Sequence, residues 1–207
     1  MMPAPRAQPA VQRVLLGDCA AQPWRNGGGV TRELLVWSAP ELQAPNDAAW
    51  CLRLSVADIT QDGPFSSYPG IDRCFAVLEG NGVELHFSQG PRQQRVVDPP
   101  LAFDGEPAIG CILLNGPTRD LNLMGRRSTG RIVMRNATPK SELEPRARWR
   151  GLFCFGKAKV DCGAVSGQQM LEPGTLIWTD QPSSESWRLI EGSRAFWLAF
   201  FAREALP

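Results

Sequence analysis

Apolar and polar residues alternate along most of the chain, and this two-residue period predicts β-strands. In WCLRLSVADI (50–59), Leu52, Leu54 and Val56 alternate with Arg53, Ser55 and Ala57, which predicts a strand with one polar or ligand-facing side. CFAVLEGNGVELHF (74–87) contains two apolar runs around 79–82 and predicts a β-hairpin. Shorter apolar runs follow, each bounded by Pro or Gly, and helical periodicity never extends beyond about two turns. The pattern therefore predicts an all-β fold.

The two halves of the sequence repeat the same order of elements. AVLEGNG aligns with LFCFGKA and ILLNG with RLIEG, so that Gly80 matches Gly156 and Gly116 matches Gly192, each 76 residues later. Two copies of an antiparallel unit predict two packed cupin-like barrels, a bicupin of the RmlC-like jelly-roll type. We expect a flexible leader at 1–12, a first barrel with a polar pocket at 13–134, and a linker plus a second, structural barrel at 135–207, forming one compact unit.

The repeat exposes a difference in polarity between its two copies. Asp120, Asn122 and Met124 share one face of a predicted strand, and their counterparts at the same offset are Phe196, Leu198 and Phe200. If these faces point inward, the first barrel keeps polar groups inside and the second is filled with hydrocarbon. Because buried polar groups are costly unless they are satisfied, the first barrel is the candidate ligand site. The sequence leaves open which face points inward.

Composition narrows the function classes. The 22 basic and 21 acidic residues give a net charge of +1 and are spread along the chain, whereas a nucleic-acid binder usually shows a concentrated basic face. No apolar stretch approaches the ~20 residues of a membrane span, and the N-terminus has no apolar signal region. We therefore expect neither nucleic acid nor membrane as a partner, and a cytoplasmic location.

Cysteine and histidine usage constrains metal chemistry. None of the six cysteines forms a C-x-x-C pair, which favours buried free thiols in a reducing compartment. His86 is the single histidine, so multi-histidine metal sites are excluded, and we expect no metal and no cofactor. In VELHF, His86 shares a strand face with Glu84, which predicts a surface position.

The stretch PWRNGGGVTREL (23–34) contains three consecutive glycines. A phosphate loop would need a following lysine, and a dinucleotide motif would need a helix after the glycines. Here an alternating segment follows, which predicts a turn into a strand. Two interpretations stay open: the glycines supply positive φ angles for the turn, or they also let the backbone approach a ligand.

Two arginines on predicted strands are candidates for anion binding. If Arg53 or Arg73 points inward, it needs a carboxylate from the protein or from a ligand. Glu33 and Asp120 are the candidate internal partners. In DGPFSSYPGIDR (62–73), we expect Phe65 and Tyr68 to plug one end of the barrel.

Taken together, PWRNGGGVTREL, WCLRLSVADI, DGPFSSYPGIDRCFAVLEGNG, FDGEP and GPTRDLNLMGRR resemble the HutD/Ves family of bacterial bicupin-like proteins. The resemblance covers roughly 23–127 and is loose beyond about 131. It implies a two-barrel cytoplasmic protein with a polar pocket in the first barrel, but no metal ligand and no firm catalytic activity. One branch of the family is associated with histidine utilisation, with a suggested role in sensing or limiting an intermediate, and another is described as stress-induced.

Carried over residue by residue, the family pattern also includes Ser66, Met124, Arg126 and Arg127. The ligand-binding residues that we predict are Trp24, Asn26, Gly27, Gly28, Gly29, Thr31, Arg53, Ser55, Arg73, Asp120 and Asn122.

Three functional hypotheses follow. The leading one is a non-catalytic, metal-free protein that binds a small carboxylate or amide, with Arg53 or Arg73 on the carboxylate. The second is a metal-free cupin enzyme of the isomerase or lyase type, with Glu33 and Asp120 as acid–base candidates. It fails if both lie on the outer surface. The third is a structural or protein-binding module whose polar face is satisfied by its own Arg–Asp pairs. A homodimer is left open.

Overall fold

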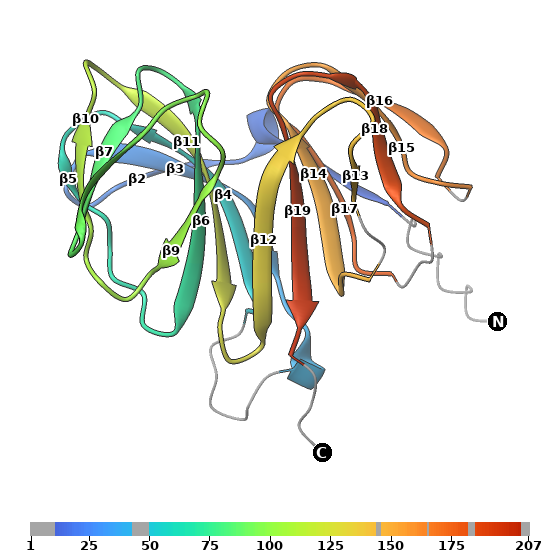
Figure 1. Ribbon diagram of the computed structural model, residues 1–207, viewed down its shortest axis with the longest axis horizontal. Helices are drawn as coiled ribbons and strands as arrows, with labels where there is room; N and C mark the ends of the chain where they lie inside the picture. The colour runs from blue at the N-terminus through green and yellow to red at the C-terminus, as the bar shows by residue number, and fades with distance from the viewer. Residues whose placement is uncertain (1–10, 43–49, 144–145, 165, 182–184, 204–207) are drawn as a thin grey trace.

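A computed structural model describes residues 11–42, 50–143, 146–164, 166–181 and 185–203. In these ranges the regular structure consists of β-strands and two short 3-10 helices, η1 (Leu16–Asp18) and η2 (Pro40–Leu42). The strands form four antiparallel sheets, arranged as two units that stand side by side (Figure 1). The all-β prediction is confirmed.

The first unit combines a larger and a smaller sheet. In spatial order, the larger sheet contains β2 (Ala21–Pro23), β3 (Gly29–Trp37), β4 (Leu52–Ile59), β11 (Thr118–Arg126), β6 (Ile71–Glu79) and β9 (Leu101–Asp104). The smaller sheet contains β5 (Gly63–Pro64), β10 (Gly110–Leu113), β7 (Val83–Phe87) and β8 (Gly90–Gln94).

The second unit has the same plan. Its larger sheet contains, in spatial order, β1 (Gln12–Leu15), β17 (Thr175–Thr179), β14 (Trp149–Cys154), β19 (Ala195–Ala202) and β12 (Gly130–Ala137). Its smaller sheet contains β13 (Glu142–Leu143), β18 (Trp187–Gly192), β15 (Ala158–Asp161) and β16 (Gln168–Leu171).

Strand order shows that the sequence repeat is a structural repeat. The series β4-β11-β6-β9 corresponds to β12-β19-β14-β17, and β5-β10-β7-β8 corresponds to β13-β18-β15-β16. The division of the chain into two units differs from the predicted boundaries, because β1 and β12, which were assigned to the first barrel wholly or in part, both pair with strands of the second unit. Part of the predicted linker, 135–137, belongs to β12, and most of the predicted leader, 1–10, lies outside the described residues.

The hairpin predicted around 79–82 is wrong. β6 pairs with β11 and β9, whereas β7 pairs with β10 and β8 in the other sheet. The chain crosses from one sheet to the other at this corner, where Gly80 and Gly82 have φ angles of +92° and +96°. A Cβ on Gly82 would collide with the carbonyl oxygen of Gln94, so this glycine permits a close crossing of two chain segments.

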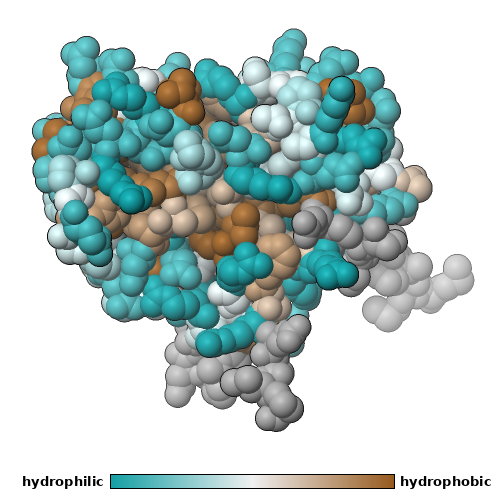
Figure 2. Space-filling view, viewed as in Figure 1, coloured by the Kyte–Doolittle hydropathy of each residue, from teal (hydrophilic) through white to brown (hydrophobic). Residues whose placement is uncertain are grey.

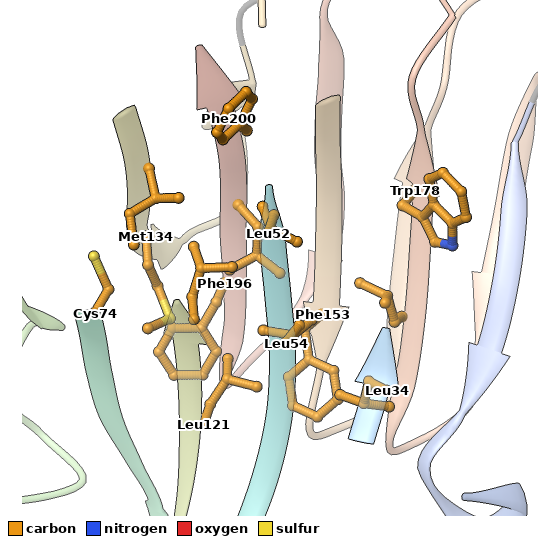
Figure 3. Packing of buried hydrophobic residues seen from close by; sticks show 14 of the residues in the cluster. Leu34, Leu52, Leu54, Cys74, Leu121, Met134, Phe153, Trp178, Phe196 and Phe200 are labelled. Carbon is orange, nitrogen blue, oxygen red and sulfur yellow. The ribbon is translucent and has the colours of Figure 1, made fainter. Parts of the chain in front are cut away.

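The two larger sheets pack against each other and form the core between the units. Leu52, Leu54 and Leu121 from the first unit meet Phe153 and Phe196 from the second (Figure 3). Each unit also encloses a cluster between its own two sheets. These inner clusters include Ile59, Phe75, Val77 and Leu85 in the first unit, and Leu152, Val160, Trp187 and Trp197 in the second.

The repeat alignment is corrected by one residue. Phe196, Leu198 and Phe200 point into the core between the units, together with Leu121 and Leu123. The β19 residues that point inside the second unit are Ala195, Trp197 and Ala199. A shift of one residue moves a strand's side chains to the opposite face of the sheet, and for this reason the predicted counterparts of Asp120, Asn122 and Met124 were wrong. The interior of the second unit is nevertheless largely apolar.

The surface carries apolar side chains mostly between hydrophilic ones (Figure 2). Scattered exposed apolar residues such as Val97 and Met170 are normal for a folded domain. Among the described residues, no helix has the length and hydropathy required to span a membrane.

Candidate ligand-binding site

Polar side chains on the inner face of the first unit's larger sheet wall a cavity of about 480 Å³. This volume lies in the range of small-molecule sites, roughly 300–1,000 Å³. The turn between β2 and β3 and the segment 64–68 contribute the remaining walls. The polar alternation of β4 and β11 therefore faces inward, as the ligand-site hypothesis requires, while Leu52, Leu54 and Leu121 on the opposite faces enter the core between the units.

Strand register arranges the cavity residues in cross-strand rows. The rows are Arg53–Met124–Arg73, then Ser55–Asn122–Phe75, then Ala57–Asp120–Val77. Successive rows are about 7 Å apart along the strands. The arginines thus lie toward one end of the floor and Asp120 toward the other.

Arg73 is the buried cation of the cavity. Its side chain is 5% exposed and its guanidinium carbon lies 4.7 Å from the ring centre of Phe65 and 5.3 Å from that of Phe103. Nε donates a long hydrogen bond to Oδ1 of Asn122 at 3.4 Å, and the two terminal nitrogens form no hydrogen bond with the described residues. Burial lowers the pKa of Arg73, and the nearby charge of Asp120 opposes this. A guanidinium held in this way has donors free for an anion.

Arg53 is already neutralised. Its Nε donates to Oε2 of Glu33 at 2.6 Å, so the internal pairing that the sequence suggested for this arginine is present. Glu33 lies beside the cavity and does not line it. The terminal nitrogens of both arginines thus form no hydrogen bond with the described residues, but only Arg73 also lacks an ionic partner there.

Asp120 is the most deeply buried acid of the cavity. Its side chain is 2% exposed, and its carboxyl group forms no hydrogen bond or ion pair with the described residues. Burial raises the pKa of Asp120 to about 8; the charge of Arg73 opposes this rise, and that of Asp58 adds to it. At neutral pH the group is mostly a neutral acid, which can donate one hydrogen bond.

Asp58 adds to this rise but is itself paired on the opposite face of β4. It accepts hydrogen bonds from Arg119 at 2.6 Å and from Arg32 at 2.8 Å. Burial works to raise the pKa of Asp58, but the two arginines outweigh it and hold the pKa below its ordinary value. This carboxylate is therefore committed to the structure.

The glycine run forms the predicted turn into a strand. Gly27, at φ +73°, donates its N–H to the carbonyl of Trp24 at 3.0 Å, and Gly28 donates to Oδ1 of Asn26 at 3.1 Å. A Cβ on Gly29 would collide with the carbonyl oxygen of Asp58. The amides of Gly27 and Gly28 are thus used inside the turn, and none of the three glycines lines the cavity; their contact with a ligand stays a prediction.

The turn instead presents side chains to the cavity. Trp24 packs against the strand and donates from Nε1 to the hydroxyl of Thr31 at 2.7 Å. The structure brings eight of the eleven predicted ligand-binding residues to this one cavity. They are Trp24, Asn26, Thr31, Arg53, Ser55, Arg73, Asp120 and Asn122.

Other lining residues were assigned differently or missed. Phe65 and Tyr68, predicted to plug the end of the unit, both line the cavity, as do Ser66 and Met124. Arg127, which the family pattern included, lies outside it and pairs with Asp72, Asp104 and Glu106. Sequence reasoning missed Gln22, Pro23, Arg25 and Pro64; their signal was weak, because they lie in turns and at strand ends, where periodicity is uninformative.

The remaining reactive side chains lie elsewhere. His86 is on the outer face, as predicted, with Nε2 3.0 Å from Oε1 of Glu84. The six cysteines, all of which lie in the described ranges, form no disulfide. Cys19 is half-buried, and burial raises the pKa of Cys111, Cys154 and Cys162 to about 12. In the described part of the chain, no three His, Cys, Asp or Glu side chains are grouped to hold a metal.

This architecture defines a cupin-like β protein with two repeated units and a polar pocket in the first. The profile of the HutD family matches residues 17–197. The chain belongs to the HutD family.

Individual relatives agree with this assignment. An uncharacterised 21.2 kDa protein in the hutC 3′ region of Pseudomonas putida is 38% identical over 107 residues, which is 52% of this chain and 54% of that protein. Protein Ves of Citrobacter koseri is 34% identical over 115 residues, 55% of this chain and 57% of that protein. The chain thus spans about half the length of these curated relatives.

A solved structure supports the fold. The structure of HutD from Pseudomonas fluorescens SBW25, in a formate condition, is similar with a TM-score of 0.79. It is 24% identical and covers 94% of this chain and all of that one. At this identity the likeness shows the fold alone.

Proposed function

We propose that this protein binds a small carboxylate in the first unit without a metal and without catalysing a reaction, and that it senses or limits an intermediate of histidine utilisation. The observation that carries the proposal is Arg73, which is almost completely buried and whose terminal nitrogens have no partner among the described residues. An unpaired buried charge is costly, and a ligand carboxylate would remove that cost by accepting two parallel hydrogen bonds.

The neighbouring side chains suit the rest of a small ligand. Ser55 and Asn122 supply neutral polar groups in the row beside Arg73, and Trp24, Phe65 and Met124 supply apolar contact surface. Apolar contact surface together with a few converging polar groups is usual in small-molecule sites. The proposed link to histidine utilisation rests on family membership and on the name of the P. putida relative.

The alternative of a self-satisfied structural module is less well supported. Arg53 and Glu33 do satisfy each other, but Arg73 and Asp120 are not joined by an ion pair in the described structure. The first interior also retains a cavity of about 480 Å³. A filled first unit with paired charges would have favoured the structural alternative.

Thermal shift and calorimetry against urocanate, formylglutamate and related acids test the proposal. A ligand at a concentration equal to its dissociation constant stabilises a protein by about 0.4 kcal/mol. We expect at least this stabilisation at millimolar concentration of one of these acids. Stabilisation below about 0.3 kcal/mol for every acid would place the dissociation constants above the millimolar range and contradict the proposal.

Two arginine variants locate the binding. Arg73→Met should abolish the stabilisation by the acid that binds. The matched control is Arg92→Met, because Arg92 is exposed and lies outside the cavity; it should keep the full response. Equal loss in both variants would mean that the acids act through general surface charge.

A metal-free enzyme is the second candidate, because Asp120 is a protonatable group inside the cavity. Glu33 is a weaker candidate, since it pairs with Arg53 and does not line the cavity. Incubating each binding acid with the protein, followed by NMR of the small molecule, distinguishes the two functions. Conversion that Asp120→Asn abolishes would replace the binding function with a catalytic one.

A further inference from the structure

Asp120 offers the cavity a second recognition group, which forms no ion pair with Arg73 in the described structure. The two residues lie on neighbouring strands but two cross-strand rows apart, with Asn122 and Phe75 in the row between them. Their backbone rows are separated by about 13 Å, although the guanidinium of Arg73 leans toward Asn122. A ligand that contacts both side chains must therefore present two separate functional groups, one to the guanidinium and one to the carboxyl group.

The surroundings of Asp120 determine what its carboxyl group can recognise. Ala57 and Val77 lie opposite it on the neighbouring strands. The ionisable groups around it are Arg73 on β6, Cys111 on β10 and Asp58 on β4. Asp58 is occupied by Arg32 and Arg119, and burial keeps the Cys111 thiol protonated.

Arg73 is therefore the only nearby cation on the described elements, and it does not contact the carboxyl group. Burial without a partner favours the uncharged form of an acid. A ligand carboxylate on Arg73 strengthens this preference, because it cancels the positive charge that opposes protonation.

We propose that Asp120 acts as a neutral hydrogen-bond donor and makes the site selective for a monocarboxylate with an uncharged hydrogen-bond acceptor at its other end. This inference rests on the proposed function, since it assumes that Arg73 holds the carboxylate. The neutral acid also explains why the buried floor of the cavity keeps a net positive charge: Arg53 is cancelled by Glu33 and Arg73 is not cancelled by Asp120. Ligands with a cationic far end are the class that such a site rejects.

Urocanate is the probe, because it carries a carboxylate at one end and an imidazole nitrogen at the other. Its ring, with an ordinary imidazole pKa near 6.5, is mostly neutral at pH 7 and fully neutral at pH 9. Titration calorimetry should show that urocanate binds the unmodified protein about tenfold more weakly at pH 9 than at pH 7. The reason is that apparent affinity follows the fraction of protein in the competent state, which here is the state with protonated Asp120. Asp120→Asn, which keeps a donor and cannot ionise, should bind within about threefold of the unmodified protein at pH 7 and should keep that affinity at pH 9.

Asp120→Ala should weaken urocanate binding by about tenfold at pH 7, because the acceptor of the ligand loses its donor. Acrylate, which keeps the carboxylate and lacks the ring, should not distinguish Asp120→Ala from Asp120→Asn. A loss of more than about tenfold in Asp120→Asn at pH 7 would show that an ionised carboxylate is needed and would overturn the inference, as would equal affinity of the unmodified protein at pH 7 and 9.

Proton uptake decides the matter without any variant. Calorimetry at pH 8 in two buffers of different ionisation enthalpy should show that binding takes up protons. The inference would be overturned if binding took up no protons or released them. The two proposals fail in different ways. Absence of binding by the unmodified protein overturns the proposed function, while binding that requires Arg73 and ignores Asp120 overturns this inference alone.

Discussion

Arg73 and Arg150 lie at equivalent positions of the two units, and only the first of them lines the cavity. Arg73 on β6 pairs in register with Met124 on β11, and Arg150 on β14 pairs with Ala199 on β19, the strand that corresponds to β11. Arg150 is 3% exposed, lies over Trp187 and donates from Nη1 to the carbonyl of Glu185 at 2.6 Å. Both halves of the repeat thus contain a buried guanidinium, but only that of Arg73 lines the cavity, whereas Arg150 donates from Nη1 to the backbone and its Nε has no hydrogen-bond partner among the described residues.

Replacing Arg73 tests whether this arginine serves function at the expense of stability. Because its charge is buried without an ionic partner, Arg73→Met should leave the free energy of unfolding unchanged or raise it by up to about 2 kcal/mol. Urea denaturation at pH 7 without ligand measures this. A loss above about 2 kcal/mol would show that Arg73 stabilises the fold and would weaken its assignment as a ligand residue.

Asp120 should make stability depend on pH in an unusual direction. Its folded pKa is raised to about 8, above the ordinary value of about 3.9 for an unfolded aspartate. Between these values the native state binds more protons than the unfolded state, so the contribution of Asp120 to stability decreases as pH rises from about 4 to 8 and then levels off.

A matched variant isolates the contribution of Asp120 to the pH dependence of stability. Asp120→Asn cannot titrate, so its stability relative to the unmodified protein should increase by up to about 4 kcal/mol between pH 5 and 8. Denaturation series of both proteins across this range, taken as differences, cancel the other titrating groups. A constant difference across the range would mean that the carboxyl group is not buried as the structure shows.

The sequence predicted the fold class and much of the cavity because both depend on local alternation. Arg53, Ser55, Asp120 and Asn122 were found because one polar face on a strand is a strong pattern. Arg25 and Pro64 were missed because turns bring them to the cavity, and the alternation of polar and apolar residues does not predict where turn residues lie. Residues of the 64–68 segment face the sheet only after folding.

The predicted hairpin and the predicted inward position of Phe196 were wrong for the same physical reason. Strands pair with partners that are distant in sequence, and the local pattern does not identify those partners. The apolar runs on either side of Gly80 resemble a hairpin, yet β6 and β7 each pair with other strands. The repeat offset placed Phe196 inside the second unit, while pairing with β14 turns it toward the core between the units. Side-chain period is two, so a single residue decides the face.

The three glycines of the turn should differ in their sensitivity to alanine. Gly28→Ala should be mild, because its Cβ would lie at an ordinary 3.4 Å from Asn26. Gly27→Ala should cost about 1 kcal/mol for its positive φ alone, since there is open space around it. Gly29→Ala should cost most, about 3 kcal/mol, because its Cβ would meet the backbone oxygen of Asp58 and crowd the ring of Trp24. Chemical denaturation of the three variants checks the order, and equal effects would contradict it.

Thiol reactivity should report the burial of the cysteines. Cys19 is half-buried, while the other five are buried, and burial raises the pKa of Cys74 to about 11 and that of Cys111 to about 12. The thiolate is the reactive form, so Ellman's reagent at pH 8 should label Cys19 in the native protein and all six thiols after unfolding. Cys19→Ser should remove the native reaction; rapid labelling of other cysteines would contradict the described packing.

Glu33 should limit how much negative charge the cavity accepts. Glu33 holds Arg53 through a 2.6 Å ion pair, so Glu33→Gln leaves a second arginine in the cavity with its charge uncancelled. A monocarboxylate should then bind about threefold more tightly, and a dicarboxylate such as formylglutamate should gain about tenfold, since pairs of partly exposed charges gain of the order of 1 kcal/mol.

The gain should shrink in high salt, because exposed charges are screened, whereas the contribution of buried Arg73 should persist. Calorimetric titration of both ligands at low and high salt measures this, and Glu84→Gln, outside the cavity beside His86, is the matched control. Equal affinities for Glu33→Gln and the unmodified protein would mean that Arg53 does not reach the ligand, leaving Arg73 as the single anion contact on the cavity floor.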